Sequence, residues 1–348
     1  MELKQDLKDI IESNKHVFID IIKNNLAWNG EKILIIGDSG KHGYHLSRAI
    51  NYGYLLACKE LKTYYEYVEQ EYDPNRNYAD KNLIKKLDEI SDGSIIICNA
   101  STSLGKLGEL GKSFRKYANL RNHRFLSATS LGSIGNKFLE LYVNAMDVDY
   151  DYLETEALRI KRILDSAKEV RITTKAGTDL VYNVEGVEAR VNTGVYKEPG
   201  KGGNLPGAET YTAPNGINVN GVVVVDVSSK VKKKTQIISE PIVLTIKDGR
   251  VVKIDGGEEA NVLKKTLVEA EKNSKRPENV TRIAELGIGL NKRATILGAM
   301  IIDEKVYGTA HIALGSNYWF GGDIRVNIHL DQVFRDPVIL VDGKPLQY

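Results

Sequence analysis

The chain has 348 residues, 42% of them hydrophobic and 27% charged, which is the composition of a folded protein with room for two domains. Its 48 basic residues nearly balance 46 acidic ones, which argues against a nucleic-acid-binding protein, because such proteins present strongly basic surfaces. The amino terminus is charged, and no apolar stretch approaches the ~20 residues that span a membrane. We therefore expect a cytoplasmic protein without a nucleic-acid or membrane partner.

The two cysteines, Cys58 and Cys98, lie far apart in apolar surroundings. Two thiols are too few for a disulfide framework or for a zinc site built on cysteine. We predict that both are buried free thiols, as is usual in a reducing compartment.

The first half of the chain alternates helical and strand patterns. Apolar residues at helical spacing predict helices over residues 3–25 and about 45–61. Short apolar runs predict buried strands at 32–36, 94–98 and 124–127. Strands separated by helices are typical of a doubly wound parallel sheet, so we predict this α/β fold for the N-terminal domain.

The first predicted strand ends in a polar, glycine-rich turn, Gly37-Asp38-Ser39-Gly40-Lys41-His42-Gly43. The turn matches neither the phosphate-loop spacing nor the Gly-x-Gly-x-x-Gly pattern of dinucleotide-binding folds. We interpret it as a tight strand-to-helix turn, and contact with a substrate at the carboxyl edge of the sheet is the less favoured alternative. His42 and His45 have no other ligand-type residues nearby to complete a metal site.

The pattern changes near residue 168, after a predicted helix over 152–167. Strand-like runs then alternate with turn signals such as Lys247-Asp248-Gly249, and one more helix is predicted near 260–273. We therefore divide the chain into an N-terminal α/β domain, residues 1–167, and a β-rich α+β metal-binding domain, residues 168–348. The strands predicted in the second domain cover residues 169–174, 179–184, 221–227, 241–247 and 251–255.

Glu285 and His311 each stand inside an apolar, strand-like run of the second domain. A buried carboxylate is costly unless it is paired with a cation. An ion pair with Arg282 is the alternative to metal binding for Glu285. A hydrogen-bonded core histidine is the alternative for His311.

His329 and Asp331 stand two residues apart in the next apolar run. In a strand, residues i and i+2 point to the same face, so these two side chains can bind one ion together. Imidazole and carboxylate suit Zn²⁺, Co²⁺, Mn²⁺ or Fe²⁺. With His311 they supply enough donors for one open metal site.

Glu209 lies between two prolines, behind a glycine-rich loop, and by itself would be interpreted as a surface-loop residue. Together with Glu285 it raises the set of candidate ligands to five, which is enough for two metal ions. From the residues alone we favour a catalytic divalent metal centre in the second domain over a hydrogen-bonded core.

At these residues the chain resembles the dinuclear metalloaminopeptidases of the aminopeptidase T and aminopeptidase S type. The likeness covers about residues 170–331, and its segments follow the order found in that family: Asn-Leu-Pro-Gly-Ala-Glu, Ala-Glu-Leu-Gly-Ile-Gly, His-Ile-Ala-Leu-Gly-Ser-Asn-Tyr and His-Leu-Asp. Tyr318 enters the candidate set only through this resemblance. The ligands that the resemblance implies are Glu209, Glu285, His311, Tyr318, His329 and Asp331.

The resemblance also implies a homodimer with two divalent ions, Zn²⁺, Co²⁺ or Mn²⁺, that releases N-terminal residues from peptides. In that mechanism the ions share a water and lower its pKa, and Glu285 or Glu209 accepts the proton as general base. Tyr318 would ligate a metal or steady the oxyanion. The leading prediction is therefore a metallo-aminopeptidase, a hydrolase that acts as a protease.

Two alternatives stay open. The same superfamily includes compact ring-cleaving dihydroxypyridine dioxygenases, which use one Fe²⁺ held by two histidines and an aspartate. His311, His329 and Asp331 would supply that set. The chain is shorter than the typical aminopeptidase of the family and has the compact length of those dioxygenases. Its segment between Tyr318 and His329, which helps to wall the active site in the aminopeptidases, is abbreviated. The third reading is a degenerate homologue that serves as a binding module, and retention of all six residues argues against it.

Overall fold

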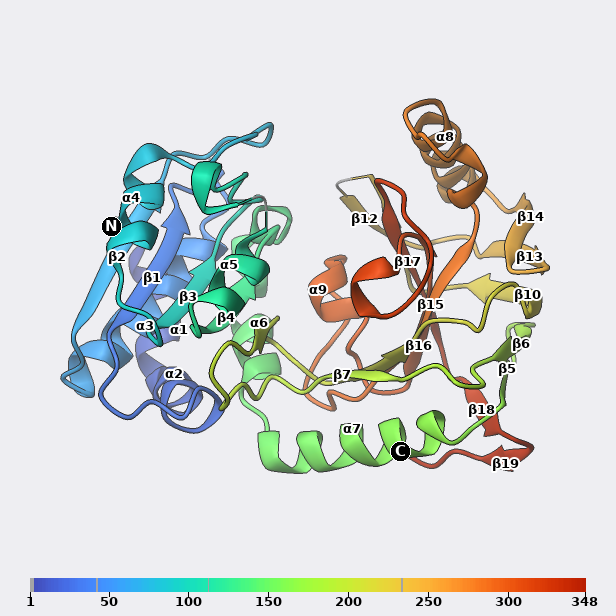
Figure 1. The fold of residues 1–348 in the computed structure, drawn as a ribbon, viewed down its shortest axis with the longest axis horizontal. Coiled ribbons are helices and arrows are strands. Elements are labelled where there is room, and N and C mark those ends of the chain that lie inside the picture. The colour runs from blue at the N-terminus through green and yellow to red at the C-terminus, as the bar shows by residue number, and fades with distance from the viewer. Residues whose placement is uncertain (1–2, 42, 112, 233) are drawn as a thin grey trace. The chain divides into compact units, whose positions relative to one another are not determined.

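The chain folds into two compact units, each with its own sheets, in a computed structural model (Figure 1). The first unit is Met1–Tyr150 with Gly194–Gly207, and the second is Asp151–Thr193 with Ala208–Tyr348. The structure describes residues 3–41, 43–111, 113–232 and 234–348, so His42 lies outside the described residues.

These units differ from the division at residue 168 in two places. Helix α7 (Tyr150–Asp165) belongs almost entirely to the second unit, where the carbonyl oxygen of Ala157 accepts a 3.1 Å hydrogen bond from Thr210 Oγ1. The segment Gly194–Gly207 returns to the first unit and adds a strand to its sheet. A cut at a single residue misses this return, because it depends on pairing between distant segments.

The first unit is built on a five-stranded parallel sheet in the order β2-β1-β3-β4-β8. The doubly wound parallel sheet predicted for this half of the chain is therefore confirmed. The sequence analysis missed β2, whose apolar residues alternate with charged ones at the edge of the sheet. The strands are β1 (Ile33–Asp38), β2 (Tyr65–Gln70), β3 (Ile95–Asn99), β4 (Arg124–Ala128) and β8 (Gly202–Gly203).

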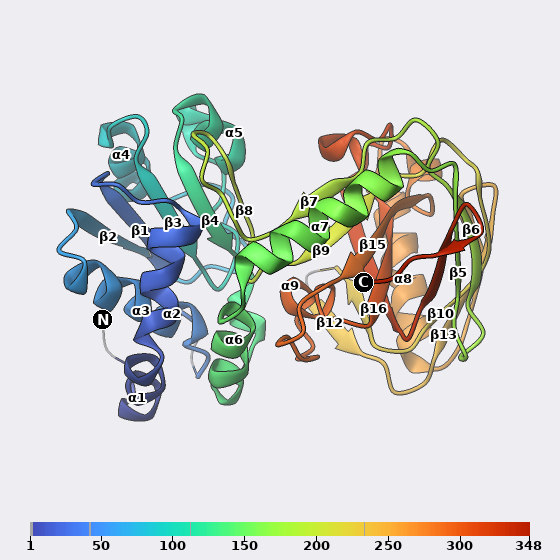
Figure 2. The ribbon, with the colours of Figure 1, turned by 90° about the horizontal axis from the view of Figure 1, so that it is seen from below.

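Helices cover both faces of this sheet (Figure 2). The helix predicted over residues 3–25 is interrupted at Asn14 and ends in a π-helical turn. One face carries α1 (Gln5–Ser13), α2 (Lys15–Asp20) and α3 (Leu46–Glu60), and the other carries α4 (Lys81–Glu89) and α5 (Phe114–Leu120). Helix α6 (Leu139–Met146) completes the unit.

The interior of the first unit is mostly apolar, and both cysteines are buried there as free thiols, as predicted. The glycine-rich turn after β1 is held by Asp38, which is buried. Its carboxylate accepts hydrogen bonds from the backbone N–H of Ser101 at 2.7 Å and from Ser47 Oγ at 3.1 Å. This carboxylate therefore serves the turn, in agreement with the structural interpretation of the motif.

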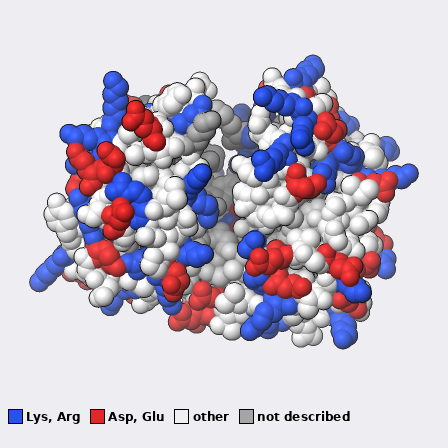
Figure 3. Space-filling view, viewed as in Figure 1, with Lys and Arg blue, Asp and Glu red and all other residues white. Residues whose placement is uncertain are grey.

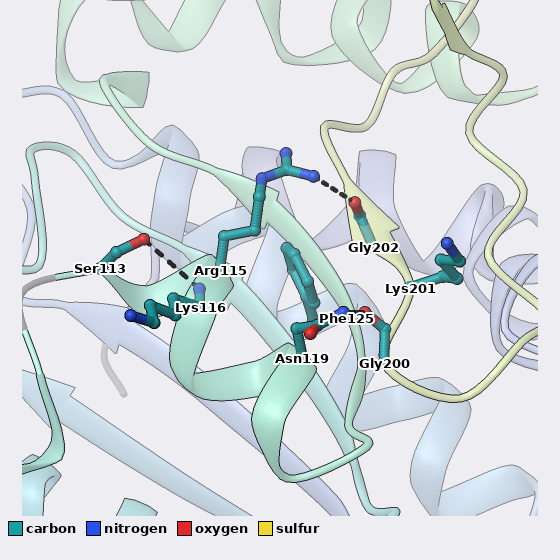
Figure 4. A pocket seen from close by; sticks show the side chains of 8 residues that line it. All are labelled: Ser113, Arg115, Lys116, Asn119, Phe125, Gly200, Lys201 and Gly202. Atoms are coloured by element: carbon teal, nitrogen blue, oxygen red, sulfur yellow. Dashed lines mark hydrogen bonds between the residues drawn. The ribbon is translucent and has the colours of Figure 1, made fainter. Parts of the chain in front are cut away.

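A pocket of about 350 Å³ opens beside α5 in the first unit (Figure 4). Arg115 donates a 2.8 Å hydrogen bond to the carbonyl oxygen of Gly202, and its guanidinium lies over the ring of Phe125. The side chains of Lys116 and Lys201 point away from each other in this view. The cations around the pocket therefore do not converge on one point.

The second unit contains two seven-stranded antiparallel sheets, as expected for a β-rich domain. One has the order β14-β13-β10-β6-β5-β18-β19, and the other has the order β12-β11-β17-β16-β15-β9-β7. Its further helices are α8 (Glu258–Lys272) and α9 (Met300–Asp303). The strands of the first sheet are β5 (Glu169–Thr173), β6 (Asp179–Asn183), β10 (Val219–Val225), β13 (Ile242–Lys247), β14 (Arg250–Asp255), β18 (Val338–Val341) and β19 (Lys344–Pro345). Those of the second are β7 (Arg190–Asn192), β9 (Glu209–Thr212), β11 (Ser228–Val231), β12 (Lys234–Ile237), β15 (Ile283–Gly289), β16 (Thr309–Gly315) and β17 (His329–Arg335).

The surface carries both signs of charge. On the face shown in Figure 3, Lys and Arg are interspersed with Asp and Glu, which agrees with the balanced composition. Among the described helices, none combines the length and the apolar character that a membrane crossing requires.

Candidate metal centre

Five of the six candidate ligands lie on four neighbouring strands of the second sheet, each opposite a glycine or an alanine. A Cβ atom added at Gly287 would lie only 2.2 Å from Cε1 of His311. A larger residue at that position would therefore occupy the space of the imidazole. The cross-strand pairs are Glu209 with Gly289, Glu285 with Ala313, His311 with Gly287, His329 with Gly315 and Asp331 with Ala313.

The charged side chains form one continuous chain of contacts. His329 Nε2 lies 3.1 Å from Asp331 Oδ1 and 3.4 Å from Glu285 Oε2. The other oxygen of Glu285 lies 3.2 Å from His311 Nε2, and Glu209 Oε2 lies 4.0 Å from the same nitrogen. Ligand atoms of Glu285, His311 and Asp331 all lie within 4.8 Å of one another. The arrangement is compact enough to bind a metal ion.

Glu209 is buried at the start of β9, so the surface-loop interpretation of this residue is wrong. The ion pair considered between Arg282 and Glu285 is also absent from the interactions of the described residues. Arg282 instead pairs with Asp323, with 3.0 Å between Nη1 and Oδ2. The charged neighbours of Glu285 are therefore His311 and His329.

Tyr318 is not brought to this cluster. Its side chain is 52% exposed, and the Arg325 guanidinium lies 4.8 Å from the centre of its ring. Among the interactions of the described residues, none joins Tyr318 to the other five candidates. The 3₁₀ turn Tyr318–Phe320 follows Asn317, whose buried amide donates a 3.0 Å hydrogen bond to the carbonyl oxygen of Ala284.

Hydrogen bonding defines which nitrogen of His329 faces the cluster. Nδ1 lies 2.8 Å from the carbonyl oxygen of Ser316, so Nδ1 carries a proton and donates it to this bond. In the neutral ring, Nε2 then presents a lone pair to the carboxylates of Asp331 and Glu285. A lone pair beside two carboxylates is repulsive unless a proton or a metal ion lies between them. The donor set therefore fits a bound cation.

The pKa values reflect the same crowding of opposite charges. Burial alone would lower the pKa of His311, but the carboxylates of Glu285, Asp331 and Glu209 raise it to about 9. Burial alone would raise the pKa of Asp331, but His329 and His311 hold it well below its usual range. In the metal-free protein the cluster is therefore balanced by protons on its histidines.

The sequence analysis missed Lys305, which is completely buried beside Glu209. Its Nζ lies 3.2 Å from Glu209 Oε1 and also contacts the carboxylate of Glu304. Asn192 Nδ2 donates a 3.2 Å hydrogen bond to the same oxygen of Glu209. The adjacent charged residues 304 and 305 follow a short apolar run and have the pattern of a solvated turn, so no spacing signal distinguishes them.

Comparison with known proteins decides the family. Residues 148–347, more than half of the chain, match the family model described as 2,5-dihydroxypyridine 5,6-dioxygenase (NicX). The chain belongs to the 2,5-dihydroxypyridine 5,6-dioxygenase family. A curated relative of that name from Pseudomonas putida strain KT2440 is 30% identical over 196 residues. The match spans about half of each protein, 54% of this chain and 55% of the relative.

Two solved structures share the fold. The structure of 2,5-dihydroxypyridine dioxygenase from Pseudomonas putida KT2440 superimposes with a TM-score of 0.71 at 19% identity, and the match covers 96% of this chain and 95% of the other. AmpT from Thermus thermophilus superimposes with a TM-score of 0.65 at 14% identity, covering 97% and 98%. The resemblance to the aminopeptidase T type is therefore correct for the fold.

The family contradicts the predicted activity. The prediction of a metallo-aminopeptidase, and with it the hydrolase and protease assignment, is wrong, because the family model and the curated relative both name a dioxygenase, an oxidoreductase. Three of the motifs that suggested a peptidase lie wholly or partly on strands β15, β16 and β17, and the fourth is the loop that leads into β9. The fold is shared with a structure of each kind of protein, so these segments do not by themselves identify the reaction. The family implies a metal cofactor, in line with the buried histidine and carboxylate group. The homodimer stays a prediction.

Proposed function

We propose that the chain is an iron(II)-dependent dioxygenase that opens the ring of a dihydroxypyridine. The observation that carries the proposal is the cluster around Asp331, in a chain of this family: Asp331 contacts the partly buried His329 and forms a compact buried group with His311 and Glu285. His311, His329 and Asp331 are the proposed ligands. Two imidazoles and one carboxylate with open positions are the donor set of non-haem Fe²⁺ oxygenases. When bound, the iron supplies the one-electron chemistry through which molecular oxygen reacts with a closed-shell ring.

We propose a single ion, in place of the two ions implied by the aminopeptidase resemblance. Asp331 and Glu285 lie against the histidine nitrogens, and two carboxylates balance the charge of one divalent ion. Glu285 is a fourth donor, since its two oxygens lie 3.2 and 3.4 Å from the two Nε2 atoms. Glu209 is a less favourable donor, at 4.0 Å from His311 and in contact with Lys305.

Trp319 is the candidate contact for an aromatic substrate. Its side chain is 55% exposed, and the centre of its ring lies 5.0 Å from that of His329. An exposed indole next to a metal ligand offers a flat surface on which a pyridine ring can stack. In this assignment Trp319 orients the substrate beside the metal centre and takes no part in proton transfer.

The test begins with metal-free protein, to which one equivalent of Fe²⁺ is added without oxygen. Oxygen uptake and loss of ring absorbance are then followed with 2,5-dihydroxypyridine. We expect one O₂ consumed for each ring opened, and no hydrolysis of aminoacyl chromogenic amides. Protein that holds one iron but consumes no oxygen with any dihydroxypyridine isomer would refute the proposal.

The role of Trp319 is tested by Trp319→Ala, with Tyr318→Ala as the control from the same exposed turn. Loss of one stacking surface should raise KM about 2- to 10-fold and change kcat little. Iron content should be unchanged in both variants. A KM equal to that of the unaltered enzyme in Trp319→Ala would remove Trp319 from the substrate site.

A further inference from the structure

Lys305 is a buried cation at the edge of the metal centre. Its side chain is fully inaccessible, and its ammonium group contacts the carboxylates of Glu209 and Glu304. Burial alone would lower the pKa of Lys305, but these two carboxylates raise it above its usual range. Lys305 is therefore a permanent positive charge within the cluster.

The backbone places Lys305 at this point. Its N–H donates to the carbonyl oxygen of Ile302 at 2.9 Å, and its own carbonyl oxygen accepts from the N–H of Asn291 at 2.8 Å. The segment lies directly against β15, because a Cβ atom at Gly289 would come within 2.8 Å of the Lys305 carbonyl carbon. Gly289 is also the cross-strand partner of Glu209. The absence of a side chain at residue 289 thus brings Lys305 to Glu209.

Glu209 already has partners other than a metal. One oxygen contacts Lys305 Nζ and Asn192 Nδ2, both at 3.2 Å, and the other lies 4.0 Å from His311 Nε2. By contrast, Glu285 contacts only the two histidines among the ion pairs of the described residues. The cluster therefore has a histidine side, which suits a metal ion, and a lysine side.

We infer that the ammonium group of Lys305 takes the place of a second metal ion beside Glu209, so that the centre binds a single metal ion. The ions of a two-metal site lie roughly 3.5–4 Å apart and share anionic ligands. An ammonium group carries positive charge but has no lone pair to offer, so it neutralises Glu209 without ligating a metal. The inference rests on the proposed single-ion function and names the residue that sets the metal count.

The test measures metal bound per chain, independently of oxygenase activity. Protein is loaded with Mn²⁺ without oxygen and analysed by elemental analysis, calorimetry and electron paramagnetic resonance. We expect one ion in the unaltered chain. Lys305→Met removes the charge at similar length and leaves Glu209 and Glu304 unbalanced, so it should bind a second, weaker ion with an exchange-coupled signal.

Glu209→Gln is the decisive companion variant, because it keeps an oxygen for Lys305 but removes the anionic ligand that a second metal would need. It should bind one ion with less than about a threefold change in Kd, whereas Asp331→Asn should weaken binding more than about 100-fold. The double variant Glu209→Gln, Lys305→Met should return to one ion. It removes the charges of Lys305 and Glu209 together, so it shows whether the second ion of Lys305→Met depends on Glu209. If Lys305→Met does not fold, the stoichiometry of the unaltered chain and the affinity of Glu209→Gln still test the inference.

Three results would overturn the inference: two ions in the unaltered chain, a loss of affinity above about tenfold in Glu209→Gln, or one ion in a folded Lys305→Met chain. Failure of the proposed function is separate. If the unaltered chain binds one ion but consumes no oxygen with dihydroxypyridines, the dioxygenase proposal fails while the role of Lys305 stands.

Discussion

The interior of the parallel sheet and the face of strands β9, β15, β16 and β17 are both buried, but they bury different chemistry. Around the parallel sheet, neutral side chains that are buried hydrogen-bond to one another. Asn99 Nδ2, for example, donates to Asn51 Oδ1 at 2.9 Å, and Asn51 donates back to the carbonyl oxygen of Asn99. The second face buries carboxylates, imidazoles and a lysine that depend on one another for charge balance.

The contrast teaches where function lies in this chain. Apolar packing serves folding stability at least as well as a buried ion cluster, because desolvating each charge costs free energy that the pairing must return. A cluster of mutually dependent charges is therefore a candidate functional site. The small residues of the two regions differ in the same way. Gly53 lets Phe18 pack on helix α3, whereas Gly287 makes room for the imidazole of His311.

The largest effect is expected from Asp331→Asn, which removes the charge of a proposed ligand and keeps its shape. Loss of a residue that only hydrogen-bonds to a metal ligand lowers metal affinity roughly 10- to 100-fold. Loss of a ligand itself should lower the affinity by more than about 100-fold and abolish oxygen uptake. The fold should persist, because the amide still reaches His329. Elemental analysis and oxygen uptake measure this, with the surface carboxylate variant Asp255→Asn as control. Full metal binding in Asp331→Asn would contradict the site.

A variant in the apolar region should affect stability and leave the metal centre intact. Ile96 is fully buried in the core between the parallel sheet and helices α4 and α5. Ile96→Ala should lower the free energy of unfolding by about 2–5 kcal/mol, because it creates a cavity. The exposed Val252→Ala should change it by less than about 0.5 kcal/mol. Denaturant unfolding gives both values. Metal stoichiometry should stay the same, and a change would link the two regions.

Gly287→Ala adds one methyl group where both packing and metal binding are at stake. The new Cβ would overlap the His311 ring, so we expect a loss of about 1–3 kcal/mol in stability together with weaker metal binding. Gly135→Ala is the matched control, since the nearest atom to its Cβ would be 3.9 Å away. Thermal unfolding with and without metal separates the two effects. Unchanged metal affinity in Gly287→Ala would show that His311 is not a ligand.

The smallest effect concerns the buried thiols of the first unit, which are kept neutral. Burial raises the pKa of Cys58 to about 11 and that of Cys98 still further. At pH 8 only about one thiol in a thousand at Cys58 is then ionised, so a thiol reagent should react slowly until the pH approaches 11. Both thiols should react at once in denaturant. Rapid reaction of the native protein at pH 8 would indicate local opening of this core.

Much of the fold follows from local patterns. Strands β1 and β3 contain continuous apolar runs, and β4 contains a shorter one. The separation of these runs by helical patterns predicts the parallel sheet. Strand β2 was not predicted from the sequence, because its half-buried apolar residues alternate with charged ones. In the second unit, strands β5, β6 and β13 bury every second residue and are bounded by turn residues, so their sequences are recognisable as strands.

The candidate site divides along similar lines. The two-residue spacing of His329 and Asp331 places both on one face of a strand, so their contact follows from the chain itself. Glu285 and His311 stand out because charge or imidazole interrupts an apolar run. Tyr318 was taken from family resemblance and is instead exposed in a turn.

Local patterns in the sequence specify the fold class and the shared strand face of His329 and Asp331, because strand periodicity is a local property. The candidate set of five residues rested in addition on charged side chains within apolar runs and on the order of the segments in the family resemblance. Only the tertiary structure decided the partners of these residues: Glu285 lies against two histidines, and Glu209 against Lys305. Those contacts join segments far apart in the chain, through strand register and the close approach that Gly287 and Gly289 permit. No local pattern records which distant side chain will share a buried charge, so Lys305 became visible only in three dimensions.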